Sequence, residues 1–268
     1  MGLIQADMKS ASLQRIVHFN VILPVDEEKA PLSAYPTLYL LHGIFGNSTS
    51  WLVNSNIRRY AEKNRIAVVI PDGENGFYLD HPQYMNRFSR YIGEELPVLT
   101  RRLFPLSHRY EDTWIGGLSM GGYGALVNGL RYGDTFSRIV ALSSGLLLYE
   151  YASSGTESSG FTSSDYQKAM FGDPGKVLES DLNPVWIYRK RKEEGRPLPK
   201  ILLDVGVDDF LLKANEKACE EFRELGADLT WRTAPGAHEW DFWDREIRWA
   251  LDHFLEKGGE AEAETLAH

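Results

Sequence analysis

Along this chain, short continuous apolar runs alternate with segments in which apolar residues recur at helical spacing among polar ones. Apolar runs predict strands at 13–23, 37–41, 66–70, 113–116, 137–142, 201–205 and 228–233. Apolar residues at helical spacing predict helices at 57–63, 91–103, 210–225 and 240–255. This alternation predicts an α/β fold, a mostly parallel central sheet with helices on both faces. We expect the first strand, 13–23, to be antiparallel, and Pro97 to kink a helix or to start one.

One stretch, 145–184, departs from this alternation. It holds no clear strand, and its part from Ser153 to Ser164 is rich in serine, glycine and threonine. It follows the predicted strand 137–142, which we expect to neighbour the strand that leads into the glycine-flanked serine at 117–121. We therefore expect this stretch to form a small cap over a pocket. A plain surface loop is the alternative. The candidate lining residues of the cap are Phe161, Tyr166, Met170 and Phe171.

Length and charge limit the classes of function. The 268 residues suit a single domain over 1–255, followed by an acidic tail at 256–268 that we expect to be disordered. The net charge of −9 argues against nucleic-acid binding, because phosphate contacts need clustered basic residues. No apolar run approaches the roughly 20 residues that span a membrane, so no membrane association is expected.

The single cysteine, Cys219, cannot form an internal disulfide, which agrees with a reducing compartment. The first 12 residues lack the pattern of a secretory signal, so we expect a cytoplasmic location. Neither a zinc-type Cys/His cluster nor a phosphate or dinucleotide loop is present, so no metal and no cofactor are expected. Whether the chain forms a homo-oligomer is left open.

The strongest chemical motif is Gly117-Leu118-Ser119-Met120-Gly121. It lies between a predicted strand and a predicted helix, the context in which Gly-x-Ser-x-Gly makes a sharp turn and raises the serine hydroxyl at the carboxyl end of the sheet. Glycines flank the serine because side chains would collide where strand and helix pass closely. Ser119 is therefore the candidate nucleophile of a serine hydrolase, in preference to a serine in an ordinary glycine-rich turn.

A serine nucleophile needs an imidazole base, and the base needs a carboxylate that holds its tautomer. In this fold the order along the chain is serine, acid, histidine. His238 is the candidate base, because it lies in the turn between the last strand and the last helix, whereas His253 lies inside that helix. The acid follows the 201–205 strand. We favour Asp209 over Asp208, which is better placed to cap the next helix.

Acyl transfer also needs two donors for the oxyanion. The first is expected to be the backbone amide of Met120, directly after the nucleophile. The second is expected in the loop after strand 37–41, where Gly43 lets the chain turn so that the amide of Ile44 points into the site. His42 lies in the same loop, and we expect it to support the loop rather than to act as a base.

Two residues are candidates for substrate binding. Tyr78 either contacts substrate or fixes its own loop, and the pattern favours neither. Trp240, close to His238, is a candidate wall of the pocket, although aromatic residues at helical spacing more often lie in a core.

The run Leu40-Leu41-His42-Gly43-Ile44-Phe45-Gly46-Asn47 resembles the short-chain acyl esterases of the tributyrin esterase type, which belong with the esterase D-like, family-one carbohydrate esterases. The similarity continues through 71–73, 77–78, 117–125, 171–173 and 236–240, and it covers about 13–255. It implies an α/β-hydrolase fold, no cofactor and a Ser119, Asp209 and His238 triad, with oxyanion amides on Ile44 and Met120.

The same resemblance implies a small-molecule ester substrate. Acetyl or butyryl esters are expected, and feruloyl or acetylated carbohydrate esters are open. Relatives of this kind include S-formylglutathione hydrolases and mycolyltransferases, so a thioesterase or an acyltransferase is the alternative. The formylglutathione enzymes usually carry a Ser-Gly-Leu-Thr-Cys-like run where this chain has His42-Gly43-Ile44-Phe45-Gly46, which disfavours that activity. A non-catalytic binding protein on the same scaffold is a third reading, and the complete set of triad residues disfavours it.

Overall fold

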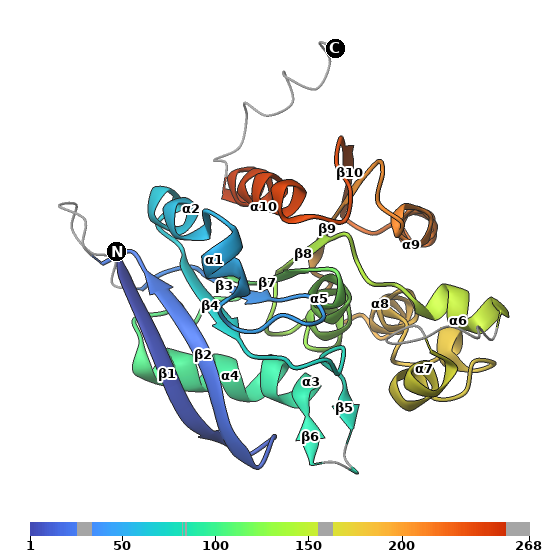
Figure 1. Cartoon of the computed structure of the whole chain (residues 1–268), viewed down its shortest axis with the longest axis horizontal. Helices are drawn as coiled ribbons and strands as arrows, with labels where there is room; N and C mark the ends of the chain where they lie inside the picture. The colour runs from blue at the N-terminus through green and yellow to red at the C-terminus, as the bar shows by residue number, and fades with distance from the viewer. Residues whose placement is uncertain (26–33, 82, 84, 155–162, 256–268) are drawn as a thin grey trace.

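The computed structural model describes residues 1–25, 34–81, 83, 85–154 and 163–255. Its main sheet has eight strands in the order β1-β2-β4-β3-β7-β8-β9-β10 (Figure 1). The strands are β1 (Gly2–Ser10), β2 (Arg15–Leu23), β3 (Thr37–Leu41), β4 (Ala67–Pro71), β7 (Thr113–Leu118), β8 (Arg138–Leu142), β9 (Lys200–Gly206) and β10 (Leu229–Ala234). From β4 to β10 all neighbours pair in parallel, whereas β2 runs antiparallel to both β1 and β4. The predicted mostly parallel sheet is confirmed.

The predicted opening strand at 13–23 is only half of a hairpin. β1 precedes it and pairs with β2 along its whole length at the edge of the sheet. Ile4, Ala6 and Met8 pack against the core, and the residues between them face outward. This period of two is the signature of a strand with one covered face, and it is the sequence signal for β1.

Helices cover both faces of the sheet (Figure 1). One face packs against α1 (Ser50–Asn54), α2 (Ile57–Asn64) and α10 (Trp240–Leu255). The other face packs against α3 (Phe88–Arg90), α4 (Leu96–Leu103), α5 (Met120–Arg131), α8 (Pro184–Glu193) and α9 (Leu212–Glu224). Successive residues of a strand point to opposite faces, so Leu38 and Leu40 lie in one apolar layer and Tyr39 and Leu41 in the other. Burial on both faces explains the continuous apolar runs of the sequence.

The predicted 91–103 helix consists of two parts. Tyr91–Glu95 forms a turn of π-helix, and α4 begins at Leu96. Pro97 lies in the first turn of α4, directly after the π-helical turn, and the backbone is helical at Glu95 as well as at Leu96. Pro97 therefore lies within one continuous helical run, at the change from π-helix to α-helix. A two-stranded sheet of β5 (Asp80–His81) and β6 (Asn86–Arg87) precedes this region.

The 145–184 insertion has no strand in its described residues. It contains α6 (Leu148–Ser154), α7 (Ser164–Phe171) and a 3-10 turn, Val177–Glu179. In Figure 1, α6 and α7 lie at the end of the molecule away from the β1–β2 hairpin. The serine-rich part at 155–162, which includes Phe161, and the predicted tail at 256–268 lie outside the described residues. In the described part of the chain, no helix is both long enough and apolar enough to cross a membrane.

Candidate active site

Five neighbouring strands, β3, β7, β8, β9 and β10, end at the same edge of the sheet. The pairs Leu41–Gly117, Leu118–Leu142 and Ala234–Gly206 mark the ends of these ladders. Loops that follow the carboxyl ends of parallel strands therefore meet there, as is usual for sites in open α/β sheets. All three predicted triad residues and both predicted oxyanion amides lie in these loops or directly after them.

Ser119 occupies the turn between β7 and α5. Its backbone has φ 53° and ψ −120°, a conformation that is rare outside glycine. A β-carbon at Gly117 would lie 2.4 Å from the carbonyl oxygen of Gly121, and one at Gly121 would lie 2.5 Å from that of Leu41. The close packing that the motif predicts is thus present, and it requires glycine at both positions.

Ser119, His238 and Asp209 form one hydrogen-bonded chain. Nε2 of His238 lies 2.9 Å from Oγ of Ser119, and Nδ1 lies 3.0 Å and 3.2 Å from the two carboxylate oxygens of Asp209. Asp208 is exposed. The expectation that Asp208 caps the next helix is wrong, because α9 begins only at Leu212 and the amide of Leu211 donates to Asp209.

Asp209 lies in surroundings that favour its charged form. Burial alone would raise its pKa, but hydrogen bonds from His238, the Leu211 amide and the Ser143 hydroxyl outweigh burial, so the pKa is lowered. A carboxylate that faces Nδ1 keeps the proton of the neutral imidazole on that nitrogen, which leaves Nε2 as an acceptor toward Ser119. The arrangement suits proton abstraction from the serine hydroxyl.

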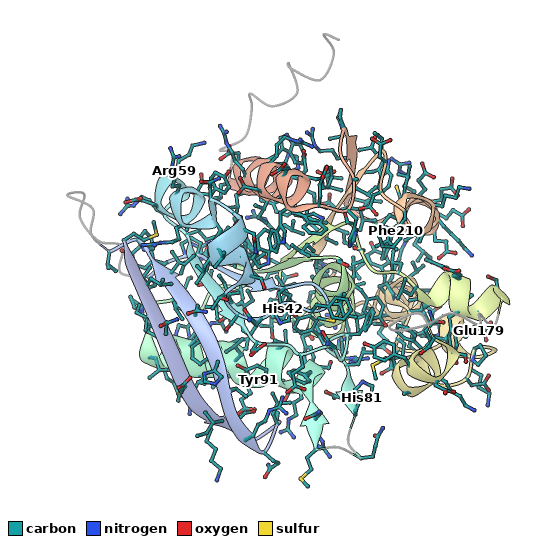
Figure 2. All side chains as sticks on the ribbon, viewed as in Figure 1. His42, Arg59, His81, Tyr91, Glu179 and Phe210 are labelled. Atoms are coloured by element: carbon teal, nitrogen blue, oxygen red, sulfur yellow. The ribbon has the colours of Figure 1, made fainter. Side chains whose placement is uncertain are left out.

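Two aromatic rings hold His238. Phe210, directly after Asp209, has its ring centroid 4.7 Å from that of the imidazole, and Trp243 of α10 meets it edge-on at 4.8 Å. Phe210 is 67% exposed, whereas Trp243 is buried; Figure 2 shows Phe210 near the end of β9. The hydrophobic pattern gives no sign of this role of Phe210, and the position of the residue directly after the favoured acid is the one signal in the sequence that points to it.

The predicted oxyanion amides both lie at this edge. Met120 is the first residue of α5, so its amide is one of the unsatisfied donors of a helix N-terminus. Among the described residues, neither the Met120 amide nor the Ile44 amide donates to an acceptor of the protein. Gly43 brings the loop close to the turn, since a β-carbon there would lie 2.7 Å from a methyl carbon of Leu118. Both amides are therefore free to receive a substrate oxygen.

His42 supports this loop from beneath, as expected. The imidazole is fully buried, the Gly73 amide donates to its Nε2 at 2.9 Å, and its Nδ1 lies 2.7 Å from the carbonyl oxygen of Gly43. Because Nε2 accepts, Nδ1 carries the proton and donates to Gly43. Figure 2 shows His42 near the middle of the molecule.

Tyr78 also belongs to this support. It is fully buried, and its hydroxyl donates to the carbonyl oxygen of His42 at 3.0 Å. A β-carbon at Gly73 would lie 2.0 Å from its ring, and one at Gly124 would lie 2.6 Å from it, so the ring fills a slot between two glycines. Tyr78 is not among the residues that line the cavity above Ser119, and its contacts agree with the second of the two alternatives, a residue that fixes its own loop.

A largely apolar cavity of about 640 Å³ opens above Ser119. Its wall includes the candidate residue Trp240 and the side chains of Ile44, Phe77, Leu147, Phe210 and Trp243. The start of the insertion contributes through Gly145 and Leu147. The cavity is large enough for a small acyl group and part of an alcohol.

Of the cap residues named from the sequence, the three that the structure describes, Tyr166, Met170 and Phe171, do not line this cavity. Phe171 is buried with its ring centroid 5.4 Å from that of Phe77, and the hydroxyl of Tyr166 donates to the carbonyl oxygen of Asn75. Met170 packs against the same apolar cluster. These side chains form a layer behind Phe77, because α7 packs on the outside of the loop that carries it. No group of three or more His, Cys, Asp or Glu in the described residues could hold a metal ion.

Comparison with known proteins agrees with this geometry. The model of the family described as "Putative esterase" matches residues 10–252. An acetyl esterase of Caldicellulosiruptor saccharolyticus is 36% identical over 259 residues, which cover 94% of this chain and 97% of that protein.

Solved structures give the same result. The fluorophosphonate-binding serine hydrolase F of Staphylococcus aureus has a TM-score of 0.84 at 27% identity, with 96% of this chain and 99% of that chain covered. The S-formylglutathione hydrolase of the same organism has a TM-score of 0.80 at 26% identity, with 95% and 99% covered. This chain therefore belongs to the esterase family and is a carboxylic ester hydrolase with the α/β-hydrolase fold.

Proposed function

We propose that this esterase hydrolyses short-chain acyl esters with Ser119 as nucleophile, His238 as general base and acid, and Asp209 as the acid that orients the imidazole. The observation that carries the proposal is the hydrogen-bonded chain from Ser119 Oγ to His238 Nε2 at 2.9 Å and from His238 Nδ1 to Asp209 at 3.0 Å. It lies at the floor of an apolar cavity, where a substrate carbonyl can reach the serine.

In the proposed reaction, the Ser119 oxygen attacks the ester carbonyl while Nε2 of His238 takes the hydroxyl proton. The amides of Met120 and Ile44 donate to the oxyanion, and the charged Asp209 stabilises the imidazolium. The imidazolium then gives its proton to the leaving alcohol, which leaves the acyl group on Ser119. Water, deprotonated by His238, attacks the acyl-enzyme, and the proton returns to Ser119 as the acid leaves.

Short acyl groups are the proposed substrate class. The similarity to an acetyl esterase over almost the full length of both chains supports acetyl and butyryl esters. The aromatic wall formed by Phe77, Phe210 and Trp240 would also accept a flat feruloyl group or the face of an acetylated sugar. The buried free thiol of Cys219 supports a cytoplasmic location, which is part of the proposal.

Thioester hydrolysis is the second candidate. The similarity to an S-formylglutathione hydrolase, at 26% identity over nearly all of both chains, favours it. The same triad would serve, since a thiolate leaves at least as readily as an alkoxide.

The test compares hydrolysis of p-nitrophenyl acetate, butyrate and octanoate, methyl ferulate and S-formylglutathione by the parent and by Ser119→Ala. We expect a steep fall in kcat/KM beyond butyrate and loss of at least a thousandfold in Ser119→Ala. Activity of Ser119→Ala within tenfold of the parent would overturn the nucleophile. Preference for the thioester by more than tenfold would select the second candidate.

A further inference from the structure

Ser143 is the first residue after β8, and it has an unusual backbone. Its φ is 45°, in the left-handed region that favours glycine, and its side chain is fully buried. Its amide donates to the carbonyl oxygen of Asp204 at 2.8 Å, so the residue is tied to β9 as well as to β8. Glycine would adopt this backbone conformation with less strain, so the presence of serine indicates a role for its hydroxyl.

The direction of the Ser143 hydroxyl follows from its partner. The indole Nε1–H of Trp243 donates to Ser143 Oγ at 3.1 Å. An indole nitrogen can only donate, so the serine oxygen must accept and its own proton is left for another acceptor. The carboxylate of Asp209 is the candidate acceptor, because the Ser143 hydroxyl is near enough to help lower the pKa of that carboxylate.

Trp243 connects the same hydroxyl to the base. Its ring meets the imidazole of His238 edge-on, with the centroids 4.8 Å apart. One buried hydroxyl thus bonds to the ring against which the proposed base packs, and it lies near the proposed triad acid.

We propose that Ser143 is a positioning residue of the active site. Its hydroxyl holds the Asp209 carboxylate toward Nδ1 of His238 and holds Trp243 against the imidazole. The inference rests on the proposed function, because it assigns Ser143 to the triad named there.

The experiment uses Ser143→Ala and Ser143→Gly in the full chain. Both remove the hydroxyl, but glycine relieves the positive φ and alanine does not. We expect both to lower kcat for p-nitrophenyl acetate about ten- to a hundredfold, the usual weight of a hydrogen bond to a charged group, with KM within about twofold.

The matched control is Ser144→Ala. Ser144 is equally buried, and its hydroxyl has no hydrogen-bond partner in the described part of the chain, so parental kinetics are expected. The other charged groups on this side of Ser143 are Asp204 of β9 and its neighbours Glu246 and Arg232. The Ser143 variants leave all three in place.

Three results would overturn the inference while Ser119→Ala remains inactive. These are parental kcat in both Ser143 variants, loss of kcat in the alanine variant alone, and a loss of kcat that is fully accounted for by the fraction of the protein that a fluorophosphonate labels. The first excludes a contribution of the hydroxyl, the second points to strain, and the third to folding. An active Ser119→Ala would instead overturn the proposed function.

Discussion

A β-carbon on Gly145 would lie 3.3 Å from the amide nitrogen of Met120. The amide of Gly145 also donates to the carbonyl oxygen of Ser119 at 2.8 Å, so the segment after β8 runs directly against the turn that carries the serine. The missing side chain at position 145 leaves the Met120 amide open to the cavity.

Gly145→Ala should therefore lower kcat at least tenfold. The new methyl group crowds the Met120 amide, and loss of one oxyanion donor typically costs on the order of 100- to 1000-fold. The measurement is kcat and KM for p-nitrophenyl acetate, with Gly175→Ala as control. A β-carbon at Gly175 would meet only a carboxylate oxygen of Asp173, at 3.4 Å, so that variant should match the parent. Parental kcat in Gly145→Ala would argue against Met120 as an oxyanion donor.

Asp209→Asn should lower kcat by about 10⁴-fold, because an amide beside Nδ1 no longer selects the tautomer in which Nε2 accepts. Asp208→Asn, one residue earlier, should stay within about twofold, since the side chain is exposed and the bond that ties this residue to Gly236 comes from the backbone amide. Steady-state kinetics of the two variants measure the difference. Equal losses would contradict the assignment of the acid to Asp209.

Tyr78→Phe should lower stability and leave substrate binding unchanged. The variant deprives the His42 carbonyl of its donor, which costs about 1–3 kcal/mol of unfolding free energy for a buried acceptor. KM should stay within about twofold, whereas Trp240→Ala, which removes a wall of the cavity, should raise KM. Urea unfolding and KM values for the butyrate ester check both statements. A large rise of KM in Tyr78→Phe at unchanged stability would restore the substrate contact.

Asp204 should make the stability of the protein depend on pH. Arg232 Nε lies 3.3 Å from a carboxylate oxygen of Asp204 and 2.8 Å from one of Glu246, and both carboxyl groups are fully buried. Burial and the neighbouring Glu246 raise the pKa of Asp204, while hydrogen bonds from Arg245 and Arg232 outweigh burial and lower that of Glu246. The folded chain thus keeps a proton on Asp204 that the unfolded chain loses above about pH 4.

Unfolding then releases the proton of Asp204. The free energy of unfolding therefore falls as pH rises above about 4, and it continues to fall up to the raised pKa of Asp204. Asp204→Asn mimics the protonated acid and carries no such proton. We expect the stability of the variant relative to the parent to increase from pH 5.5 to pH 8.5. Urea unfolding at three pH values in this range measures the trend, and parallel curves for the two proteins would contradict it.

The sequence by itself determined the features that depend on local geometry. Alternating apolar blocks predict the parallel sheet, and the glycines around Ser119 predict the close contact of β7 and α5, because backbone collisions at Gly117 and Gly121 involve residues near in sequence or a neighbouring strand. The position of His238 between the last strand and the last helix also follows from chain order alone. A resemblance in motifs was enough to name the esterase family.

Only the tertiary structure decided which side chains meet. Asp208 and Asp209 are adjacent in the sequence, but the late start of α9 directs Asp209 alone toward His238. The slot that buries Tyr78 is formed by Gly73 and Gly124, which are 51 positions apart. Ser143 and Trp243 are 100 positions apart and meet beside Asp209. Such contacts depend on how the loops pack at the edge of the sheet, and the hydrophobic pattern of a single chain carries no information about that packing.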